Sequence, residues 1–181
     1  VTTPIVLTLA FTMSAAHGFK EKPFYEQERI GLDGRPFIIN KIRSMREIYD
    51  DEGHALPDED RVTKIGILLR KSRLDELPQL YNILKGDMSF VGPRPVTTFQ
   101  KLLANDNLRN SVRPGLTGLA QINDKNSKSP EEILSLDHKY IKHQSFGLDL
   151  KIMLQTPISL WKNRKSSHYR PAAQMKHAKF Q

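Results

Sequence analysis

Apolar and polar positions follow one another along the chain in patterns that predict mostly helices and one small β-hairpin. Residues 24–44 place two runs of apolar and aromatic side chains on either side of Gly31-Leu32-Asp33-Gly34. A glycine-rich tetrapeptide between two such runs favours a tight turn between paired strands. The stretch that follows, residues 45–60, is acidic and rich in turn formers, so we expect an exposed loop with room for one helical turn.

Helical periodicity covers most of the remaining chain. Apolar positions within residues 59–70 recur at the spacing of an amphipathic helix, and a second helix is predicted over about 75–85, ended by Gly86. Ser72 is a candidate cap for that second helix. Residues 112–124 are punctuated by glycine and predict a turn and an extended piece. Further helices are predicted over residues 96–109, Pro130–His143 and Phe146–Trp161.

The first 19 residues contain no Asp, Glu, Lys or Arg. Their apolar stretch, residues 5–16, spans about twelve positions, whereas a helix that crosses a bilayer needs roughly 20. The stretch also lacks the basic start of a secretory signal. The residues alone leave three interpretations open: a buried core helix, which residue statistics favour, the end of a longer membrane segment, and a re-entrant membrane element.

Composition excludes several kinds of chemistry. The chain of 181 residues contains no cysteine, which excludes disulfides, thiolate catalysis and cysteine-based zinc sites. Its six histidines show no ligand spacing except His138 and His143, five residues apart, and we interpret them as surface residues. Walker, Rossmann and HExxH motifs are absent from the sequence, so the common nucleotide and zinc motifs are excluded too. The length fits one domain with a substantial core.

Most of the net charge of +8 lies near the C-terminus. Residues 161–181 contain six Lys or Arg and no acid, whereas residues 1–160 carry 22 bases and 20 acids. A basic tail beside an amphipathic segment can bind anionic lipid; it can also be a solvated disordered end or bind nucleic acid nonspecifically. We expect residues 165–181 to form a basic, disordered tail.

Asp75 and Glu76 are adjacent carboxylates in a region rich in cations. The dipole of a nearby helix N-terminus would favour both acids, which is an alternative to any catalytic role. The surrounding cations favour phosphate chemistry, because carboxylates hold Mg²⁺ while arginine and lysine neutralise phosphate oxygens. A carboxylate can also attack phosphorus directly and form an acyl phosphate. The nearby cations are Lys41, Arg43, Arg70, Lys71, Arg73, Arg94, Arg113 and Lys125.

Arg94 stands between two prolines, Pro93 and Pro95, whose rings fix the backbone φ angle on both sides. A rigidly held guanidinium suits bidentate recognition of phosphate. An ordinary surface arginine in a loop is the alternative interpretation.

Four motifs follow one another along the chain: KIRSM, LRKSRLDELPQLYNILKGDMSFVGPRP, VRPGLTGLAQIN and DLKIM. In this order they resemble those of the bacterial sugar transferases, the monotopic polyprenol-phosphate phosphoglycosyl transferases, and the likeness runs from about Thr3 to Arg164. The resemblance implies transfer of a sugar phosphate from a UDP-sugar to undecaprenyl phosphate, with release of UMP. It also implies a requirement for Mg²⁺ and a place at the first membrane step of glycoconjugate or polysaccharide synthesis.

Carried onto this sequence, the resemblance implies that Asp75 is the nucleophile of a covalent phosphosugar intermediate. Glu76 would be its partner, and both carboxylates are the predicted metal ligands. The predicted phosphate-binding residues are Lys41, Arg70, Arg94, Arg113 and Lys125.

The chain departs from the family pattern at Asp124-Lys125, where the family usually has Gly-Arg. Lys125 keeps the positive charge but loses the planar fork of arginine, and Asp124 adds an acid beside an expected anion site. The departure puts the role of Lys125 in doubt and leaves the two carboxylates unaffected.

The resemblance also implies a re-entrant helix, with which members of the family enter the membrane and which turns at a Ser-Pro. In this sequence Thr3-Pro4 stands at that position. We therefore expect an α+β fold that is mostly helical, with a small β-hairpin, a partial re-entrant membrane helix and interfacial amphipathic helices. The predicted division is a membrane-inserted helix over 1–19, a catalytic domain over 20–164 and the tail over 165–181.

The expected location is the cytoplasmic face of the bacterial inner membrane, with monotopic attachment and contact with membrane lipid. A UDP-sugar donor and undecaprenyl phosphate acceptor are the expected substrates, with no specific nucleic-acid partner, and a homodimer stays open. The rival hypothesis is a noncatalytic basic protein that binds anionic lipid or nucleic acid through its tail. The sequence names neither the sugar nor the pathway.

Overall fold

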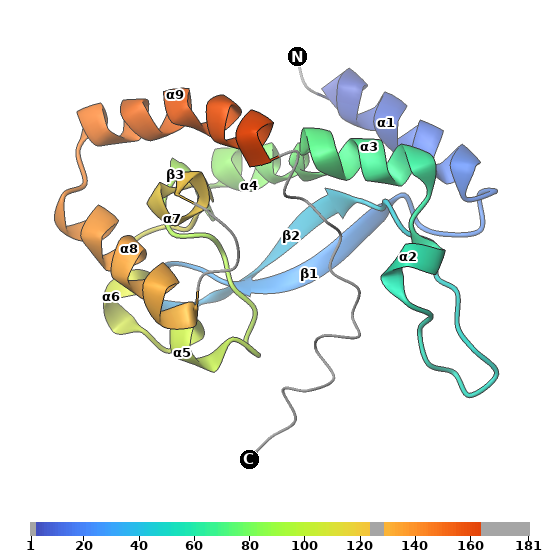
Figure 1. Ribbon diagram of the computed structural model, residues 1–181, viewed down its shortest axis with the longest axis horizontal. Coiled ribbons are helices and arrows are strands. Elements are labelled where there is room, and N and C mark those ends of the chain that lie inside the picture. Colours follow the sequence, from blue (N-terminus) through green and yellow to red (C-terminus); the bar gives the residue numbers. More distant parts are fainter. Residues whose placement is uncertain (1–2, 124–128, 164–181) are drawn as a thin grey trace. The chain divides into compact units, whose positions relative to one another are not determined.

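The structure, a computed structural model, describes residues 3–123 and 129–163. Within these residues the chain forms two compact units. The first unit contains residues 3–25 and 40–78, and the second contains residues 26–39, 79–123 and 129–163. Each unit has a core of its own, and the elements of both are labelled in Figure 1.

The predicted β-hairpin is confirmed. Strand β1 (Phe24–Ile30) pairs with strand β2 (Pro36–Ile42), and the 3₁₀ turn η1 (Leu32–Gly34) joins them. Asp33 and Gly34 adopt positive φ angles of 56° and 73°, a geometry that short polar residues and glycine tolerate best. The turn residues that signalled the hairpin in the sequence are therefore those that its backbone requires.

In the first unit an N-terminal helix packs on a second helix. Helix α1 (Thr3–Ala16) lies against helix α3 (Lys64–Ser72), as Figure 1 shows. Met13 of α1 is buried with Ile42 of β2 and Leu69 of α3. One face of α1 thus packs in the core of the first unit, as the first of the three interpretations of the N-terminal stretch expects.

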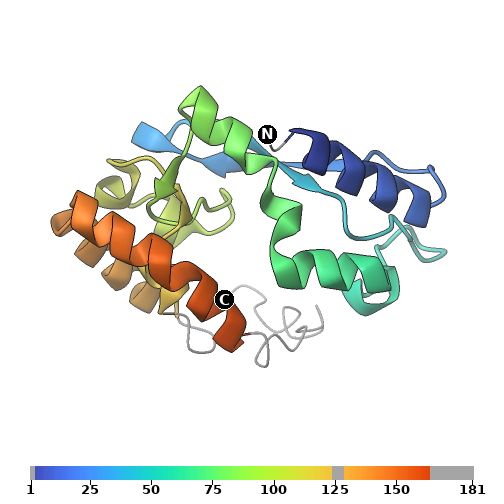
Figure 2. The same ribbon diagram turned by 90° about the horizontal axis from the view of Figure 1, so that it is seen from above.

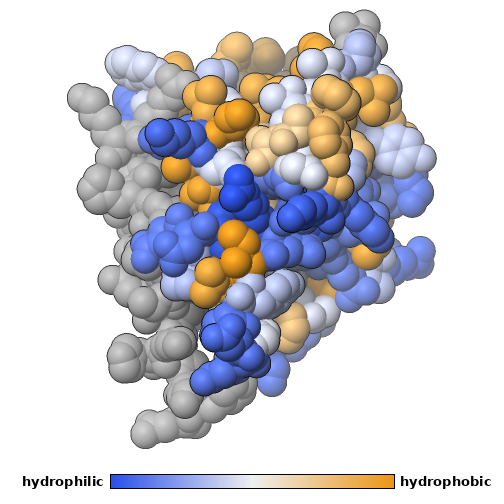
Figure 3. All heavy atoms as spheres, turned by 90° about the vertical axis from the view of Figure 1, so that its right-hand side faces the viewer, coloured by the Kyte–Doolittle hydropathy of each residue, from blue (hydrophilic) through white to orange (hydrophobic). Residues whose placement is uncertain are grey.

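The other faces of α1 leave large apolar side chains uncovered within the first unit. Ile5, Leu7 and Phe11 each expose half or more of their surface. In Figure 3, apolar side chains gather toward the upper part of the view, where α1 lies. Among residues 3–123 and 129–163, no helix combines the length and hydropathy that crossing a bilayer requires. The N-terminal helix exists, and its insertion into a membrane stays a prediction.

The prediction of one continuous helix over residues 59–70 is wrong. Helix α2 (Asp58–Arg61) ends, and α3 starts only at Lys64. Thr63 leaves helical geometry, and its hydroxyl caps α3 by accepting a hydrogen bond from the N–H of Gly66 at 3.0 Å. The cap therefore interrupts a pattern that periodicity alone reads as one helix.

The helix predicted over about 75–85 also begins later than expected. A 3₁₀ turn η2 (Leu74–Glu76) precedes Pro78, and helix α4 (Gln79–Lys85) follows it. The predicted cap Ser72 instead donates its hydroxyl to the carbonyl oxygens of Leu68 and Leu69, within α3. Gly86, with φ of +90°, ends α4 as predicted.

The second unit is built around two short parallel strands whose pairing the sequence did not predict. Strand β3 (Ser89–Val91) pairs with strand β4 (Gly115–Thr117), with Ser89 opposite Gly115 and Val91 opposite Thr117. Val91 is buried together with Tyr140 and Ile152. The helices of this unit that follow the strands are α7 (Leu119–Ile122), α8 (Pro130–Lys142) and α9 (Phe146–Asn163).

Helices α8 and α9 confirm the last two predicted helices. Ser129 and Glu132 form a reciprocal capping box at the start of α8, with Pro130 in the first turn. Figures 1 and 2 show α7 beside both long helices, in agreement with their contacts. The single helix predicted over 96–109 is wrong, because that stretch holds only α5 (Lys101–Ala104) and α6 (Asn107–Asn110).

Three glycines bring the chain segments beside β3 and β4 into backbone contact. A Cβ atom on Gly115 would lie 2.1 Å from the backbone nitrogen of Gly92, and one on Gly118 would lie 2.1 Å from the Gly92 carbonyl oxygen. No side chain fits at such distances without a shift of the backbone. The glycines of the GPRP and PGLTG motifs are thus required for packing.

His17 contradicts the interpretation of the histidines as surface residues. It is 7% exposed, and its Nδ1 atom lies 3.2 Å from the carboxylate of Glu21. Burial lowers the pKa of His17, while Glu21 acts in the opposite direction. His17 directly follows α1, and no motif in the sequence marks this histidine as enclosed.

Candidate active site

A sharp turn at the end of α3 carries the two adjacent carboxylates. Arg73 adopts left-handed geometry (φ 59°, ψ 16°) and ends α3, with its N–H bonded to the carbonyl oxygens of Arg70 and Leu69. The turn η2 follows at once, and Pro78, whose missing N–H interrupts a continuous helical hydrogen-bond ladder, lies between η2 and α4. Left-handed geometry costs a residue with a side chain on the order of 1 kcal/mol. The rest of the fold must therefore stabilise this turn.

Asp75 is buried, with 9% of its surface exposed. Its Oδ1 atom is enclosed and has no hydrogen-bond partner among the residues that the structure describes. Burial raises the pKa of the Asp75 carboxyl, and the neighbouring Glu76 carboxylate raises it further. The charges of Lys41, Arg73 and Arg70 act in the opposite direction. A buried carboxylate oxygen without a donor is costly to the fold, which makes it a candidate functional group.

Glu76 is held by two cations that come from different elements. Its Oε1 atom accepts hydrogen bonds from Lys41 Nζ of β2 at 2.9 Å and from Arg73 Nη1 at 3.4 Å. The side chains of Lys41 and Glu76 are mostly buried, with 19% and 12% exposed. The neighbours Asp75 and Glu76 therefore have different environments: one oxygen of Asp75 lacks a partner within the described part of the chain, whereas Glu76 is paired.

Arg70 reaches the same region from the last turn of α3. Its Nε donates to the Ser44 hydroxyl at 2.7 Å, and its Nη2 contacts the sulfur of Met45. Gly66 lets α3 approach the backbone of Ser44, because a Cβ there would lie 2.1 Å from the Ser44 carbonyl oxygen. Arg70 thus acts on Asp75 through its charge, while its hydrogen bonds fix it to the chain after β2.

The first unit brings together four predicted site residues, namely Lys41, Arg70, Asp75 and Glu76. It adds Arg73, which the sequence placed only among the nearby cations. A signal for Arg73 was present, because residues three apart face each other in a helical turn and Arg73 precedes Glu76 by three. A turn that reverses direction at Arg73 itself was not foreseeable from that spacing.

In the second unit, Arg94 is the exposed member of an otherwise buried segment. Gly92, Pro93, Pro95 and Val96 are all buried, and Arg94 between them is exposed. The backbone therefore runs inside the unit and presents the arginine side chain outward. The rigid holding of this side chain for phosphate recognition stays a prediction.

Arg113, also in the second unit, donates from Nε to the carbonyl oxygen of Gly86 at 2.8 Å and is otherwise exposed. Lys125, its neighbour Asp124 and the tail over 165–181 lie outside the described residues. Thr3 and Pro4 begin α1, and the carbonyl oxygen of Pro4 accepts a hydrogen bond from the Thr8 hydroxyl at 2.8 Å. Their role as a membrane turn stays a prediction.

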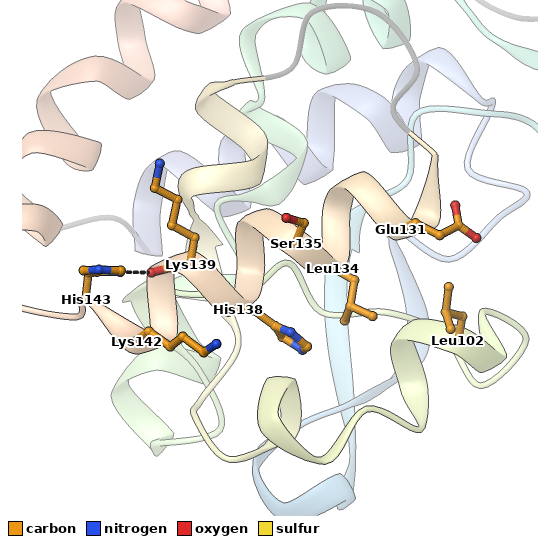
Figure 4. A pocket seen from close by; sticks show the side chains of 8 residues that line it. All are labelled: Leu102, Glu131, Leu134, Ser135, His138, Lys139, Lys142 and His143. Atoms are coloured by element: carbon orange, nitrogen blue, oxygen red, sulfur yellow. Dashed lines mark hydrogen bonds between the residues drawn. The ribbon is translucent and has the colours of Figure 1, made fainter.

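Other features of the described chain do not involve the predicted site residues. Asp50, Glu52 and His54 gather on an exposed loop, an arrangement that is common without a metal. A shallow depression of about 590 Å³ lies beside α8 and is lined in part by Leu102, Leu134 and His138. Figure 4 shows Leu134 and His138 pointing to one side of α8, toward the segment that carries Leu102, and Lys139 pointing to the other.

The arrangement in the first unit suits attack on an anionic phosphate ester. The charges of Lys41, Arg70 and Arg73 attract an anion and stabilise charge that develops on its oxygens. Asp75 supplies a carboxylate whose Oδ1 is not committed to a donor within the described residues. Such a carboxylate can act as a nucleophile or as a ligand for a hard cation.

The chain belongs to the bacterial sugar transferase family, whose model matches residues 1–163. Over 135 residues it is 49% identical to an uncharacterized sugar transferase, EpsL, of Bacillus subtilis (strain 168), a match that covers 74% of this chain and 67% of that protein. Two further relatives, both named UDP-glucose:undecaprenyl-phosphate glucose-1-phosphate transferase, come from Xanthomonas campestris pv. campestris and Caulobacter vibrioides.

The Xanthomonas protein is 39% identical over 166 residues, which cover 84% of this chain and 34% of that protein. The Caulobacter protein is 42% identical over 148 residues, which cover 75% of this chain and 55% of that protein. The chain thus spans between a third and about half the length of these two relatives.

Proposed function

We propose that this protein transfers a sugar 1-phosphate from a UDP-sugar to undecaprenyl phosphate and releases UMP. The names of the Xanthomonas and Caulobacter relatives support this reaction class and make UDP-glucose the first donor to test. The observation that carries the proposal is the buried Asp75, whose Oδ1 lacks a partner among described residues while three cationic side chains act on it.

The reaction divides into two displacements at phosphorus. A carboxylate oxygen of Asp75 attacks the β-phosphorus of the donor, and the bond from that phosphorus to the bridging oxygen breaks. UMP leaves with the bridging oxygen, and the sugar phosphate stays on Asp75 as an acyl phosphate. A phosphate oxygen of undecaprenyl phosphate then attacks the same phosphorus, and the Asp75 carboxylate leaves. A covalent relay suits this pair of substrates, because one is water-soluble and the other is a lipid.

The surrounding side chains prepare Asp75 for this role. The raised pKa of Asp75 accompanies a more basic carboxylate, which is a better nucleophile once ionised. Lys41 and Arg73 engage Glu76, so the second acid is held in place while the first is left available. Arg94, exposed on the second unit, is proposed to bind the phosphate groups of the donor through its guanidinium fork.

We also propose that Mg²⁺ takes part, with Asp75 and Glu76 as its ligands. The Oδ1 of Asp75, which has no partner among residues 3–123 and 129–163, fits a hard cation, which prefers oxygen ligands. Glu76 fits less simply, since its Oε1 already accepts hydrogen bonds from Lys41 and Arg73. When bound, the ion would neutralise charge on the diphosphate of the donor.

A lipid acceptor further motivates monotopic attachment to the cytoplasmic face of the inner membrane. Ile5, Leu7 and Phe11 of α1 are exposed, and Phe146, Leu154 and Trp161 of α9 are more than half exposed. Apolar side chains of this kind suit partial burial at the boundary of a bilayer.

The test is UMP release from UDP-glucose in nanodiscs that contain undecaprenyl phosphate, with and without Mg²⁺. Wild type should turn over, and Asp75→Asn should lose turnover because an amide neither attacks phosphorus nor binds the ion well. Asp58→Asn is the matched control, since Asp58 is an acid of the first unit whose carboxylate pairs with Arg61.

Full turnover by Asp75→Asn would overturn the nucleophile assignment. Silence of wild type across a panel of UDP-sugars, with folded protein, would overturn the proposed function and favour a binding role. Activity that is undiminished after chelation of divalent ions would remove Mg²⁺ from the proposal and leave the rest.

A further inference from the structure

The backbone of the Pro93-Arg94-Pro95 segment cannot hold itself in place by ordinary strand pairing. Both prolines lack an N–H, so Arg94 is the only one of the three residues with a backbone donor. The carbonyl oxygens of all three residues nevertheless accept hydrogen bonds from groups in distant parts of the second unit.

Each of the three carbonyls has a different donor. The Pro93 oxygen accepts from the N–H of Gly115 at 2.9 Å. The Arg94 oxygen accepts from Nη2 of Arg109, and the Pro95 oxygen accepts from Nη1 of Arg29 at 3.0 Å. Two arginine side chains and one strand therefore fix the segment through its acceptors.

Arg109 is itself fixed by a buried carboxylate. Its Nε donates to Oδ2 of Asp137 at 2.8 Å, and only 2% of either side chain is exposed. Its backbone N–H donates to Oδ1 of Asp106, which caps α6 and also pairs with His138 of α8 at 2.8 Å. The guanidinium thus links α8 to the Pro93–Pro95 segment, with Nε on Asp137 and Nη2 on the Arg94 carbonyl.

Arg29 approaches the segment from β1. Its Nη2 lies within hydrogen-bond distance of Gln27 Oε1 on the same strand, while Nη1 reaches Pro95. Beside this contact, the N–H of Ile30 donates to the Val96 carbonyl oxygen at 2.9 Å. The hairpin strand thereby supports the end of the segment that Arg109 does not contact.

We propose that Arg109, fixed by Asp137, and Arg29 are positioning residues that hold the Pro93–Pro95 backbone so that Arg94 presents its guanidinium in one direction. The inference rests on the proposed function, in which Arg94 binds donor phosphates. Neither arginine needs to touch substrate. Their fork geometry matters, because a guanidinium has separate donors for two acceptors and a lysine ammonium is a single point.

The test is a double-mutant cycle on kcat/KM for UDP-glucose. Arg109→Lys keeps the charge beside Asp137 and should lower kcat/KM about tenfold, mainly through KM, since small displacements of a binding group are costly. Arg29→Ala, at a less buried position, should have a smaller effect in the same direction. In an Arg94→Ala background, both changes should alter kcat/KM by less than about twofold, because the residue they orient is gone.

Arg61→Lys is the matched control, since Arg61 is a mostly buried arginine that bonds Asp58. It should leave kcat/KM unchanged with or without Arg94. Equal effects of Arg109→Lys and Arg29→Ala in the presence and absence of Arg94 would show a purely structural role and overturn the proposal.

Hydrogen exchange gives a readout that does not depend on activity. Arg29→Ala should speed exchange at the amides of Arg94 and Val96 and leave the amides of α8 unchanged; unchanged exchange at Arg94 and Val96 would overturn the proposal. The two proposals fail separately. If wild type is inactive but exchange is accelerated in Arg29→Ala, the proposed function is overturned, while the inference that Arg29 holds the Pro93–Pro95 backbone stands.

Discussion

Two buried aspartates, one in each unit, show opposite uses of the same side chain. Asp75 is 9% exposed and Asp137 is 2% exposed, and burial raises the pKa of both carboxyls. Asp137 is paired with Arg109 at 2.8 Å. Asp75 has cations that act on it through their charge, and its Oδ1 has no partner in the described residues.

The difference contrasts a carboxylate that is satisfied within the fold with the carboxylate that we propose as the nucleophile. In the second unit a guanidinium satisfies the acid, and the pair ties α6 to α8. In the first unit, the cations bond Glu76, Ser44 and Met45 instead of the more deeply buried acid. A low exposed fraction therefore does not distinguish the two roles, whereas the partners of each oxygen do.

The largest expected difference between the two aspartates is in formation of the covalent sugar-phosphate adduct. Incubated with UDP-glucose and Mg²⁺ but no acceptor, wild type should release about one equivalent of UMP and gain the mass of a sugar phosphate. Asp75→Asn should do so at least about 10³-fold more slowly, because the nucleophile is removed. Asp137→Asn should still form the adduct in its folded fraction. Intact-mass spectrometry measures both, and an adduct on Asp75→Asn would show that the nucleophile lies elsewhere.

The second largest expected effect is on the free energy of unfolding, and it comes from substitution of Asp137. Asp137→Asn leaves the Arg109 guanidinium buried without its counter-charge, so we expect a loss of about 3 kcal/mol in the free energy of unfolding. Asp58→Asn, which breaks the more exposed pair with Arg61, should cost less than about 1 kcal/mol. Urea unfolding checks both. Equal losses would mean that burial does not set the value of these pairs.

Asp75→Asn should change stability in the opposite direction. Because the pKa of Asp75 is raised in the folded state, its contribution to stability is complete below the unfolded pKa, about 4, and is lost as pH rises through the folded pKa. The uncharged amide in Asp75→Asn does not titrate and so avoids that loss. The free energy of unfolding of this variant should therefore exceed that of wild type by about 1 kcal/mol at neutral pH.

The gain should shrink as pH falls and vanish near pH 4. Melting temperatures of wild type and Asp75→Asn across pH 4–8 measure this dependence. A gain that stays constant over the range would trace it to packing and remove the link to titration of Asp75.

The smallest effect should come from the turn before the carboxylates. Arg73→Gly relieves left-handed geometry at φ 59° and should raise the free energy of unfolding by about 0.5 kcal/mol, while it removes one hydrogen bond to Glu76. Arg73→Lys keeps both charge and backbone strain and should leave stability unchanged. A loss of stability in Arg73→Gly would show that the bond to Glu76 outweighs the strain.

Local signals allowed some elements to be predicted from the sequence. The Gly31-Leu32-Asp33-Gly34 turn specified the hairpin, and Pro130 marked the start of α8, because each signal lies within a few residues of the element it sets. Periodicity failed at Thr63 and Pro78, where a cap and a missing N–H divide apolar patterns into separate turns. These failures concern boundaries rather than the kind of structure.

Long-range features were beyond the sequence alone. Strands β3 and β4 have three residues each and are separated by more than twenty, so neither length nor spacing marks their pairing. Arg109 and Asp137 are 28 residues apart, and nothing local links them. The family motifs predicted Asp75, Glu76, Lys41 and Arg70 as site residues, and the structure places these four together in the first unit. The left-handed turn at Arg73 depends on packing that no motif encodes.

The backbone contact among Gly92, Gly115 and Gly118 has a consequence at the level of the gene. Every missense change in a glycine codon adds at least one side-chain carbon, and at Gly115 and Gly118 that carbon would stand 2.1 Å from a backbone atom of Gly92. These codons therefore offer no conservative replacement. A directed-evolution library should therefore leave these three codons fixed.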